Sequence, residues 1–147
     1  MFKLISKTLA AVAMVSVALF GSANAKTLKI ETHFTASSPN GEVAAQFAKN
    51  VEMFSGGSLK IEMFYSSSVT GKSAEVFNSA QTGIIDCDMT GAGYQTGKNA
   101  AFQFAGDVMG GYDNPYQQYE FLNFPGAQEA VDALYNKYGM TLIGWWI

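Results

Sequence analysis

Apolar residues recur at two spacings along the chain, and segments of the two kinds alternate. Over residues 28–32, 59–63 and 85–89 they occupy every second position, which is the period of a β-strand. Between these segments they lie three or four positions apart, which is the period of a helix. Strands that alternate with helices predict an α/β fold, with a mostly parallel sheet flanked by helices.

The first predicted helix carries signals at both ends. Ser38 followed by Pro39 is typical of an N-cap and the first helical position. Gly56 and Gly57 end the helix. Its predicted apolar face consists of Val43, Ala44, Phe47, Ala48, Val51 and Phe54. Because this helix connects two predicted strands, we expect those strands to be parallel.

The rest of the chain predicts further elements of both kinds. Short helices are expected over 73–80 and 115–122, a firmer helix over 126–138, and a helical turn over 100–104. Loops are expected over 66–71 and 106–114, where polar residues and glycines gather. The apolar segment 140–146 predicts a fourth strand.

Residues 83–98 predict a buried strand followed by a glycine-rich loop. Ile85, Cys87 and Met89 would share one face of the strand, and glycines follow at 91, 93 and 97. Tyr94 and Gly93 lie in this loop, at the edge of the sheet where open α/β folds bind ligands. A tight turn with a packed tyrosine would give the same pattern, so both interpretations stay open.

His33 ends the first predicted strand and should therefore lie at the same edge of the sheet. It either lines a site or caps the strand. Since it is the only histidine, it cannot form a zinc site with the single Cys87 or a Ser–His–Asp set. The start of a calcium loop at Asp86 lacks the glutamate that its twelfth position requires. We therefore expect no metal and no cofactor.

A phosphate-binding loop is the remaining chemical alternative. Gly71-Lys72-Ser73 lies between a predicted strand and a predicted helix, which is the setting of such a loop. Ser66 stands where the loop requires its first glycine, and the second near-match, at Gly97-Lys98, is followed by asparagine. A secreted nucleotide-handling enzyme with a degenerate loop is thus an alternative function.

Residues 1–25 have the composition of a secretory signal peptide. Lys3 and Lys7 precede an apolar run over 9–20, and Ala23-Asn24-Ala25 is a small-residue cleavage site. The run is too short to cross a bilayer, so we expect cleavage before Lys26 and export to the periplasm.

Composition narrows the function classes further. The 147 residues suffice for one domain, and 48% hydrophobic residues indicate a packed core. A formal net charge of −3, with no arginine among the basic residues, excludes a typical nucleic-acid-binding protein.

Several segments, taken in order, resemble the solute-binding proteins of tripartite ATP-independent periplasmic (TRAP) transporters. Thr27 to Phe34 (TLKIETHF) and the following SSPNGE are similar to the start of that family. Ser55 to Glu62 (SGGSLKIE) and Gly71 to Phe77 (GKSAEVF) are similar to its second strand and next helix. Gly93 to Phe102 (GYQTGKNAAF) resembles the branch that binds keto acids and related organic carboxylates.

The resemblance implies a two-lobed binding protein that captures a small organic carboxylate and delivers it to a membrane permease, with no catalysis. It implies that Tyr94 contacts the ligand, together with His33, Phe34 and the backbone of Gly93. Residues 26–147 would then form the N-terminal lobe of a periplasmic-binding-protein-like fold.

Two features depart from this family. Its members are more than twice as long, and they clamp the ligand carboxylate with an arginine, which this chain lacks. The chain also stops inside an apolar segment, so we expect a fragment without its second lobe. A stand-alone interaction domain that uses its aromatic C-terminus is the other alternative.

Overall fold

The computed structural model describes residues 25–106, 108 and 110–145, so residues 1–24 of the predicted leader lie outside the described residues. In the described part, strands β1 (Lys26–Thr32), β2 (Leu59–Phe64) and β3 (Cys87–Met89) form one sheet in the order β2-β1-β3. Both pairings are parallel, as the strand–helix–strand pattern predicts. The carboxyl ends of β1 and β3 therefore meet at one edge of the sheet, with β1 in the middle.

The third strand is shorter than predicted. It begins at Cys87, and Ile85 lies before it, although the Ile85 side chain is only 1% exposed. The backbone amides of Ile84 and Ile85 both donate to the carbonyl of Ser79 at the preceding helix, at 2.9 and 3.4 Å. Because these amides are already bonded there, they cannot extend the ladder with β1.

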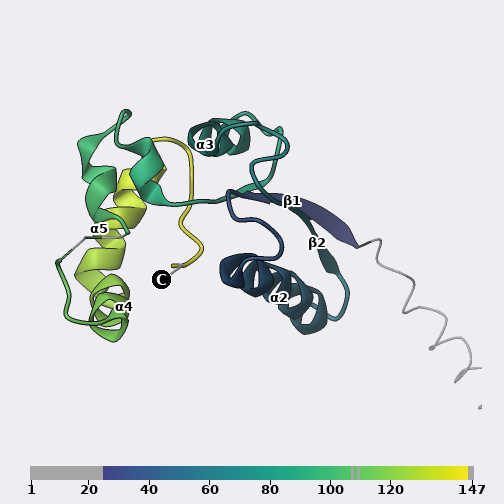
Figure 1. Ribbon diagram of the computed structural model, residues 1–147, viewed down its shortest axis with the longest axis horizontal. Helices are drawn as coiled ribbons and strands as arrows, with labels where there is room; N and C mark the ends of the chain where they lie inside the picture. Colours follow the sequence, from purple (N-terminus) through teal and green to yellow (C-terminus); the bar gives the residue numbers. More distant parts are fainter. Residues whose placement is uncertain (1–24, 107, 109, 146–147) are drawn as a thin grey trace, which may run out of the picture.

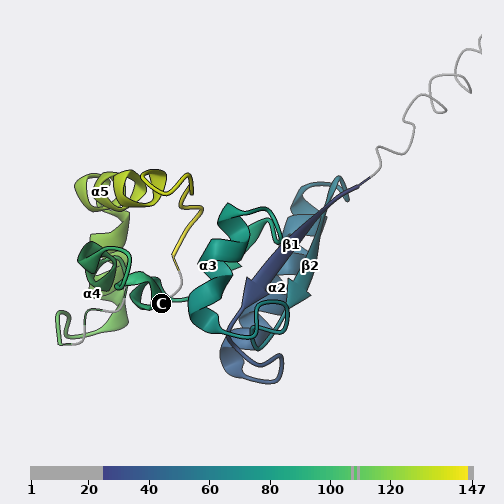
Figure 2. The same ribbon diagram turned by 90° about the horizontal axis from the view of Figure 1, so that it is seen from above.

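Helices α2 (Pro39–Phe54) and α3 (Ser73–Gln81) cover opposite faces of this sheet (Figures 1 and 2). Both begin and end within a residue or two of the predicted bounds. The hydroxyl of Ser38 accepts a hydrogen bond from the amide of Gly41 at 3.1 Å, which confirms the predicted N-cap. Gly56 and Gly57 adopt positive φ after the helix, as a glycine stop requires.

The buried face of α2 differs from the predicted one. Val43 and Phe54 are 56% and 81% exposed, whereas Ala44 and Gly41 are buried. A Cβ at position 41 would clash with the carbonyl oxygen of Thr35. The helix therefore packs closely through its small residues, which turns the larger Val43 and Phe54 toward solvent.

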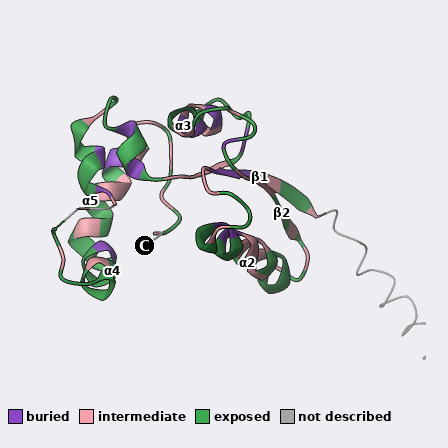
Figure 3. Ribbon diagram, viewed as in Figure 1, coloured by how far each residue is buried: buried purple, intermediate pink, exposed green. Residues whose placement is uncertain are grey.

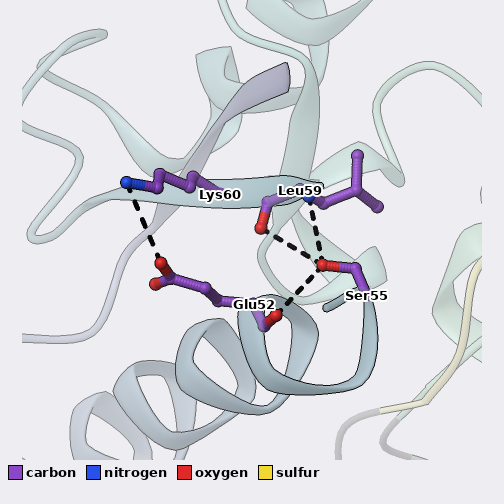
Figure 4. A network of polar contacts seen from close by, with 4 residues as sticks. All are labelled: Glu52, Ser55, Leu59 and Lys60. Carbon is purple, nitrogen blue, oxygen red and sulfur yellow. Dashed lines mark hydrogen bonds and ion pairs between the residues drawn. The ribbon is translucent and has the colours of Figure 1, made fainter. Parts of the chain in front are cut away.

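A small polar network fixes the turn from α2 to β2 (Figure 4). The hydroxyl of Ser55 donates to the carbonyl of Glu52 at 3.1 Å and accepts from the amide of Leu59 at 3.1 Å. Lys60 and Glu52 add an exposed ion pair at 3.9 Å, which contributes little because water screens it. The serine thus sets where β2 starts relative to the end of the helix.

The remaining elements form a second layer beside the sheet (Figure 1). Helices α4 (Pro115–Asn123) and α5 (Pro125–Asn136) occur where the sequence predicts them. The predicted glycine loop contains a short 3₁₀ helix, η1 (Ala92–Gln95), and a second one after the loop, η2 (Ala100–Phe104), is the expected helical turn. The side chain of Asn99 caps η2 by accepting from the amide of Ala101 at 2.9 Å.

An aromatic cluster joins this second layer to α3. Phe77 on α3 and Phe102 on η2 are fully buried, with ring centroids 5.8 Å apart in an edge-to-face arrangement. Tyr135 and Tyr138 pack against both rings at 5.2 to 5.9 Å. Figure 3 shows the buried positions gathering on α3, the carboxyl half of β1 and the 3₁₀ segment. This cluster is the principal core outside the sheet.

The fourth strand predicted over 140–146 is wrong for residues 140–145, which form no strand; residue 146 lies outside the described residues. In Figure 1 this segment lies apart from the three strands. The amide of Met140 donates to the carbonyl of Tyr135 at 3.2 Å, and its side chain packs against the aromatic cluster. An apolar segment becomes a strand only beside a hydrogen-bonded neighbour, and here, of residues 140–145, only Met140 packs on the aromatic core, while Ile143 is 77% exposed.

Candidate functional site

Three aromatic side chains meet at the carboxyl edge of the sheet. His33 and Phe34 directly follow β1, and Tyr94 lies in η1 after β3. The ring centroids of His33 and Phe34 are 3.9 Å apart, and those of His33 and Tyr94 are 5.3 Å apart in an edge-on arrangement. We call these three residues the aromatic triad. The structure thus brings together three of the four residues proposed from the sequence.

His33 is uncharged at neutral pH in this setting. Burial lowers the pKa of its imidazole below the ordinary value of 6.5. Its Nδ1 atom is buried and has no hydrogen-bond partner among the described residues. A neutral imidazole carries one donor and one acceptor, so the hydrogen-bonding capacity of Nδ1 is unused among the described residues.

Tyr94 presents a partly open ring to solvent, with 46% of the residue exposed. Its backbone amide donates to the carbonyl of Gly91 at 3.1 Å, which closes the turn that carries it. A Cβ on Gly93 would meet no atom within 4 Å, and its φ is not positive. Neither steric crowding nor the backbone angle therefore requires a glycine at position 93. The role of Gly93 as a ligand contact stays a prediction.

Lys98, the basic residue nearest to Tyr94 in the sequence, is engaged elsewhere. Its Nζ lies 5.6 Å from the centroid of the Phe77 ring, over the aromatic core. Its carbonyl accepts a hydrogen bond from the hydroxyl of Tyr138 at 3.3 Å. Both contacts hold Lys98 against the second layer.

A buried carboxylate lies just behind the triad. Glu31, two residues before His33, is 0% exposed, and its Oε1 accepts from the amides of Val69 and Thr70 at 2.6 and 3.3 Å. Its Oε2 has no partner among the described residues. The loop that follows β2 is therefore tied to β1, and further bonds from Ser66 to Phe34 and from Ser67 to Thr32 complete the attachment.

A second carboxylate faces the first one. Asp88 on β3 is the direct register partner of Glu31 on β1. Burial raises the pKa of Asp88 to about 6, and the charge of Glu31 adds to this. Asp88 in turn helps burial raise the pKa of Tyr135 to about 12. The Oδ1 of Asp88 also lacks a partner among the described residues.

These contacts explain why the phosphate-loop alternative is not favoured. The amides of Val69 and Thr70, which precede the Gly71-Lys72-Ser73 segment, donate to Glu31. An internal carboxylate thus holds donors that a phosphate would need. Among the described residues, no group of three or more histidine, cysteine or acidic side chains is placed to hold a metal ion.

A separate groove lies over the second layer. It has a volume of about 380 Å³ and is lined mainly by apolar side chains of η2, α4 and α5, with Lys137 and Asn99 as polar members. Phe104 and Phe121 line it and are 60% and 48% exposed. None of the four residues proposed from the sequence lines this groove.

The acidic pair behind the triad was not predicted from the sequence. Alternation along β1 placed Glu31 with Lys29 on a polar face, yet Glu31 is fully buried and Lys29 is exposed. One signal was available: an acidic residue just before a strand end, with a serine- and glycine-rich loop at the same edge to supply amides. The pairing with Asp88 depends on strand register, which no single segment reveals.

Comparison with known proteins identifies the chain's relatives. The family model of bacterial extracellular solute-binding proteins, family 7, matches residues 30–147. A comparison with the curated proteins found no significant match.

No helix within residues 25–106, 108 and 110–145 is both long and apolar enough to cross a bilayer.

Three solved structures illustrate the likeness. A TRAP periplasmic solute-binding protein from Rhodobacter sphaeroides, in an apo open form, is 28% identical with a TM-score of 0.73 over 80% of this chain. One from Pseudoalteromonas atlantica with bound sodium and pyruvate is 20% identical, with a TM-score of 0.71 over 79% of this chain. An extracytoplasmic solute receptor of Bordetella pertussis that binds pyroglutamic acid is 21% identical, with a TM-score of 0.66 over 80%. The chain spans only 37%, 35% and 38% of these three proteins, respectively.

Proposed function

The chain belongs to family 7 of the bacterial extracellular solute-binding proteins, and from this membership we propose that it supplies the N-terminal lobe of the solute-binding subunit of a TRAP transporter. Such a subunit captures a small organic acid outside the cytoplasm and delivers it to a membrane permease. The family is one of transport proteins rather than of enzymes, and we propose no reaction for this chain.

The aromatic triad is the observation that carries the proposed ligand site. It combines a tyrosine that is 46% exposed with a half-buried histidine whose ring lies 5.3 Å from it. It stands at the carboxyl ends of two parallel strands, where ligands of α/β folds bind. We propose Tyr94 and His33 as hydrogen-bonding contacts and Phe34 and the backbone of Gly93 as part of the same wall.

Small organic acids are the proposed ligand class. Two of the similar structures contain pyruvate and pyroglutamic acid, which are both small carboxylates. Because the chain spans little more than a third of these proteins, the proposed lobe offers only one wall of a cleft. A small-molecule site usually buries most of its ligand, so we expect this chain alone to bind weakly, with a Kd on the order of millimolar or above.

Titration of the ¹⁵N-labelled chain with pyruvate and with pyroglutamate, followed by NMR, tests the site. We expect millimolar titrations to shift the amide signals of residues 33–34 and 93–94. Tyr94→Phe should weaken binding by about 0.5–1.5 kcal/mol, because it removes one hydroxyl and leaves the ring in place. Tyr116→Phe is the matched control, since Tyr116 lies on α4 and is 81% exposed.

Two outcomes would count against this assignment. Unchanged affinity in Tyr94→Phe would place the tyrosine in a purely structural role. Ligand-dependent shifts confined to the residues of the α5 groove, such as Ala130 and Lys137, would move the site to that groove.

Export through a cleaved leader is part of the same proposal. The Ala23-Asn24-Ala25 site supports removal of residues 1–25. Mass spectrometry of protein from the periplasm of an expressing bacterium should show a mature N-terminus at Lys26. A chain that retains Met1 in that fraction would contradict the assignment.

A further inference from the structure

Uncompensated negative charge lies directly behind the aromatic triad. Glu31 and Asp88 face each other across β1 and β3. His33 follows Glu31 by two residues, and Thr90 follows Asp88 by two, which corresponds to roughly 7 Å of extended chain. The acidic pair is therefore the next layer of side chains beneath the edge where we place the ligand.

No basic side chain neutralises this pair within the described part of the chain. The ion pair found there joins Lys60 to Glu52, on the far side of the first βα unit. Glu31 is bonded only to backbone amides, and both Glu31 and Asp88 keep one oxygen without a partner. The negative charge thus remains when both groups are ionised.

The groups that face the ligand are themselves uncharged. Burial lowers the pKa of His33, so its imidazole is neutral at pH 7. Three backbone amides near this edge are already bonded, because Val69 and Thr70 donate to Glu31 and Gly41 donates to Ser38. The uncharged tyrosine and histidine side chains at this edge suit a hydroxyl or carbonyl group of the ligand better than a second carboxylate.

We infer that Asp88 and Glu31 are specificity-determining residues, which make this lobe accept the uncharged end of an organic acid and disfavour a dicarboxylate. The inference rests on the proposed function and deepens it, since it names the ligand class: monocarboxylates that carry a hydroxyl or keto group. The two acids act through the field they impose on the site, without touching the ligand.

The test compares two ligands of matched length. Succinate carries two carboxylates, and 4-hydroxybutyrate replaces one of them with a hydroxymethyl group. Unit charges roughly 8–10 Å apart, at an effective dielectric constant of about 20–40, predict that each of the two acids makes 4-hydroxybutyrate bind about fourfold to thirtyfold tighter than succinate. The Kd of each is measured by NMR titration of the ¹⁵N-labelled chain at pH 7.5, where Asp88 is ionised.

Asp88→Asn removes one of the two charges with little change in size. It should narrow the ratio of the two Kd values severalfold, mainly by strengthening succinate binding. Asp113→Asn is the matched control, because Asp113 is exposed in the loop before α4; it should leave the ratio unchanged. Glu31→Gln provides a second variant, should Asp88→Asn fail to fold.

Each result decides the matter. Tighter 4-hydroxybutyrate binding whose advantage shrinks in Asp88→Asn supports the inference. Equal or tighter succinate binding, or a ratio that Asp88→Asn and Glu31→Gln both leave unchanged, overturns it while the proposed function stands. Absence of binding by both ligands, and by pyruvate, overturns the proposed function and the inference with it.

Discussion

At the scale of single residues, Asp88 holds a carboxylate that the fold has largely removed from water. Desolvation by burial raises its pKa from 3.8 to about 6, and the charge of Glu31 adds to the effect. The ionised form of Asp88 therefore makes the folded state less stable. Such a group makes the stability of a protein depend on pH over a defined window.

The sign of that dependence follows from the raised pKa. Between pH 4 and pH 6, Asp88 is protonated more often in the folded than in the unfolded chain. Protonation of Asp88 therefore favours the folded state at low pH. As the pH rises through about 6, this contribution to the free energy of unfolding is lost, and it amounts to at most about 3 kcal/mol. We expect the free energy of unfolding of the wild type, relative to Asp88→Asn, to fall between pH 4.5 and pH 7.

Chemical denaturation at a series of pH values measures this difference. Asp113→Asn, with the same change of chemistry at an exposed position, should follow the wild-type curve. If the free energies of unfolding of the wild type and of Asp88→Asn change with pH in parallel, Asp88 does not titrate in this range.

At the scale of elements, α2 illustrates how one cap sets a helix against the sheet. The hydroxyl of Ser38 donates to the carbonyl of Thr35 at 2.7 Å and accepts from the amide of Gly41 at 3.1 Å. Gly41 in turn packs where a Cβ would clash with Thr35. Cap and close packing thus depend on the same short turn that follows the aromatic residues His33 and Phe34.

Ser38→Ala should reduce the free energy of unfolding by about 1 kcal/mol, since the amide of Gly41 loses its partner. Thermal and chemical unfolding provide the measurement. Ser37→Ala is the control, because Ser37 is exposed one residue earlier in the same turn and lies outside the cap. Equal losses in the two variants would mean that the cap bond carries no net stability.

At the scale of the whole molecule, two layers share one aromatic core but expose different surfaces. The sheet with α2 and α3 forms one layer, and η1, η2, α4 and α5 form the other (Figures 1 and 2). Phe104 and Phe121 line the 380 Å³ groove of the second layer while largely exposed. A contiguous apolar surface of this kind binds hydrophobic probes, whereas a single exposed apolar residue does not.

We therefore expect the native chain to enhance the fluorescence of anilinonaphthalene sulfonate. Phe104→Ser should lower that signal with a small change in stability, because the residue is 60% exposed. Phe54→Ser, at an 81% exposed position on α2 outside the groove, should leave it unchanged. Equal signals in Phe104→Ser and the wild type would locate the dye elsewhere.

The sequence was most informative where structure depends on neighbouring residues. The Ser38–Pro39 start, the Gly56–Gly57 stop and the existence of strands β1 and β2 follow from local signals, and all are confirmed. Two strands joined by a helix must run parallel in one sheet, so the sequence also placed His33, Phe34 and Tyr94 at a common edge. Their part in ligand binding stays a prediction.

Tertiary structure decided everything that depends on which surfaces meet. Residues 140–145 have the apolar pattern of a strand, but the aromatic core holds Met140 and no ladder forms. Val43 and Ala44 are both apolar in the sequence, yet Ala44 is buried and Val43 is 56% exposed, because only Ala44 lies on the face that the helix turns toward the sheet. Buried Glu31 and half-buried Asp88 become a pair only through the register of β1 with β3, because that register is set by contacts between segments far apart in the chain.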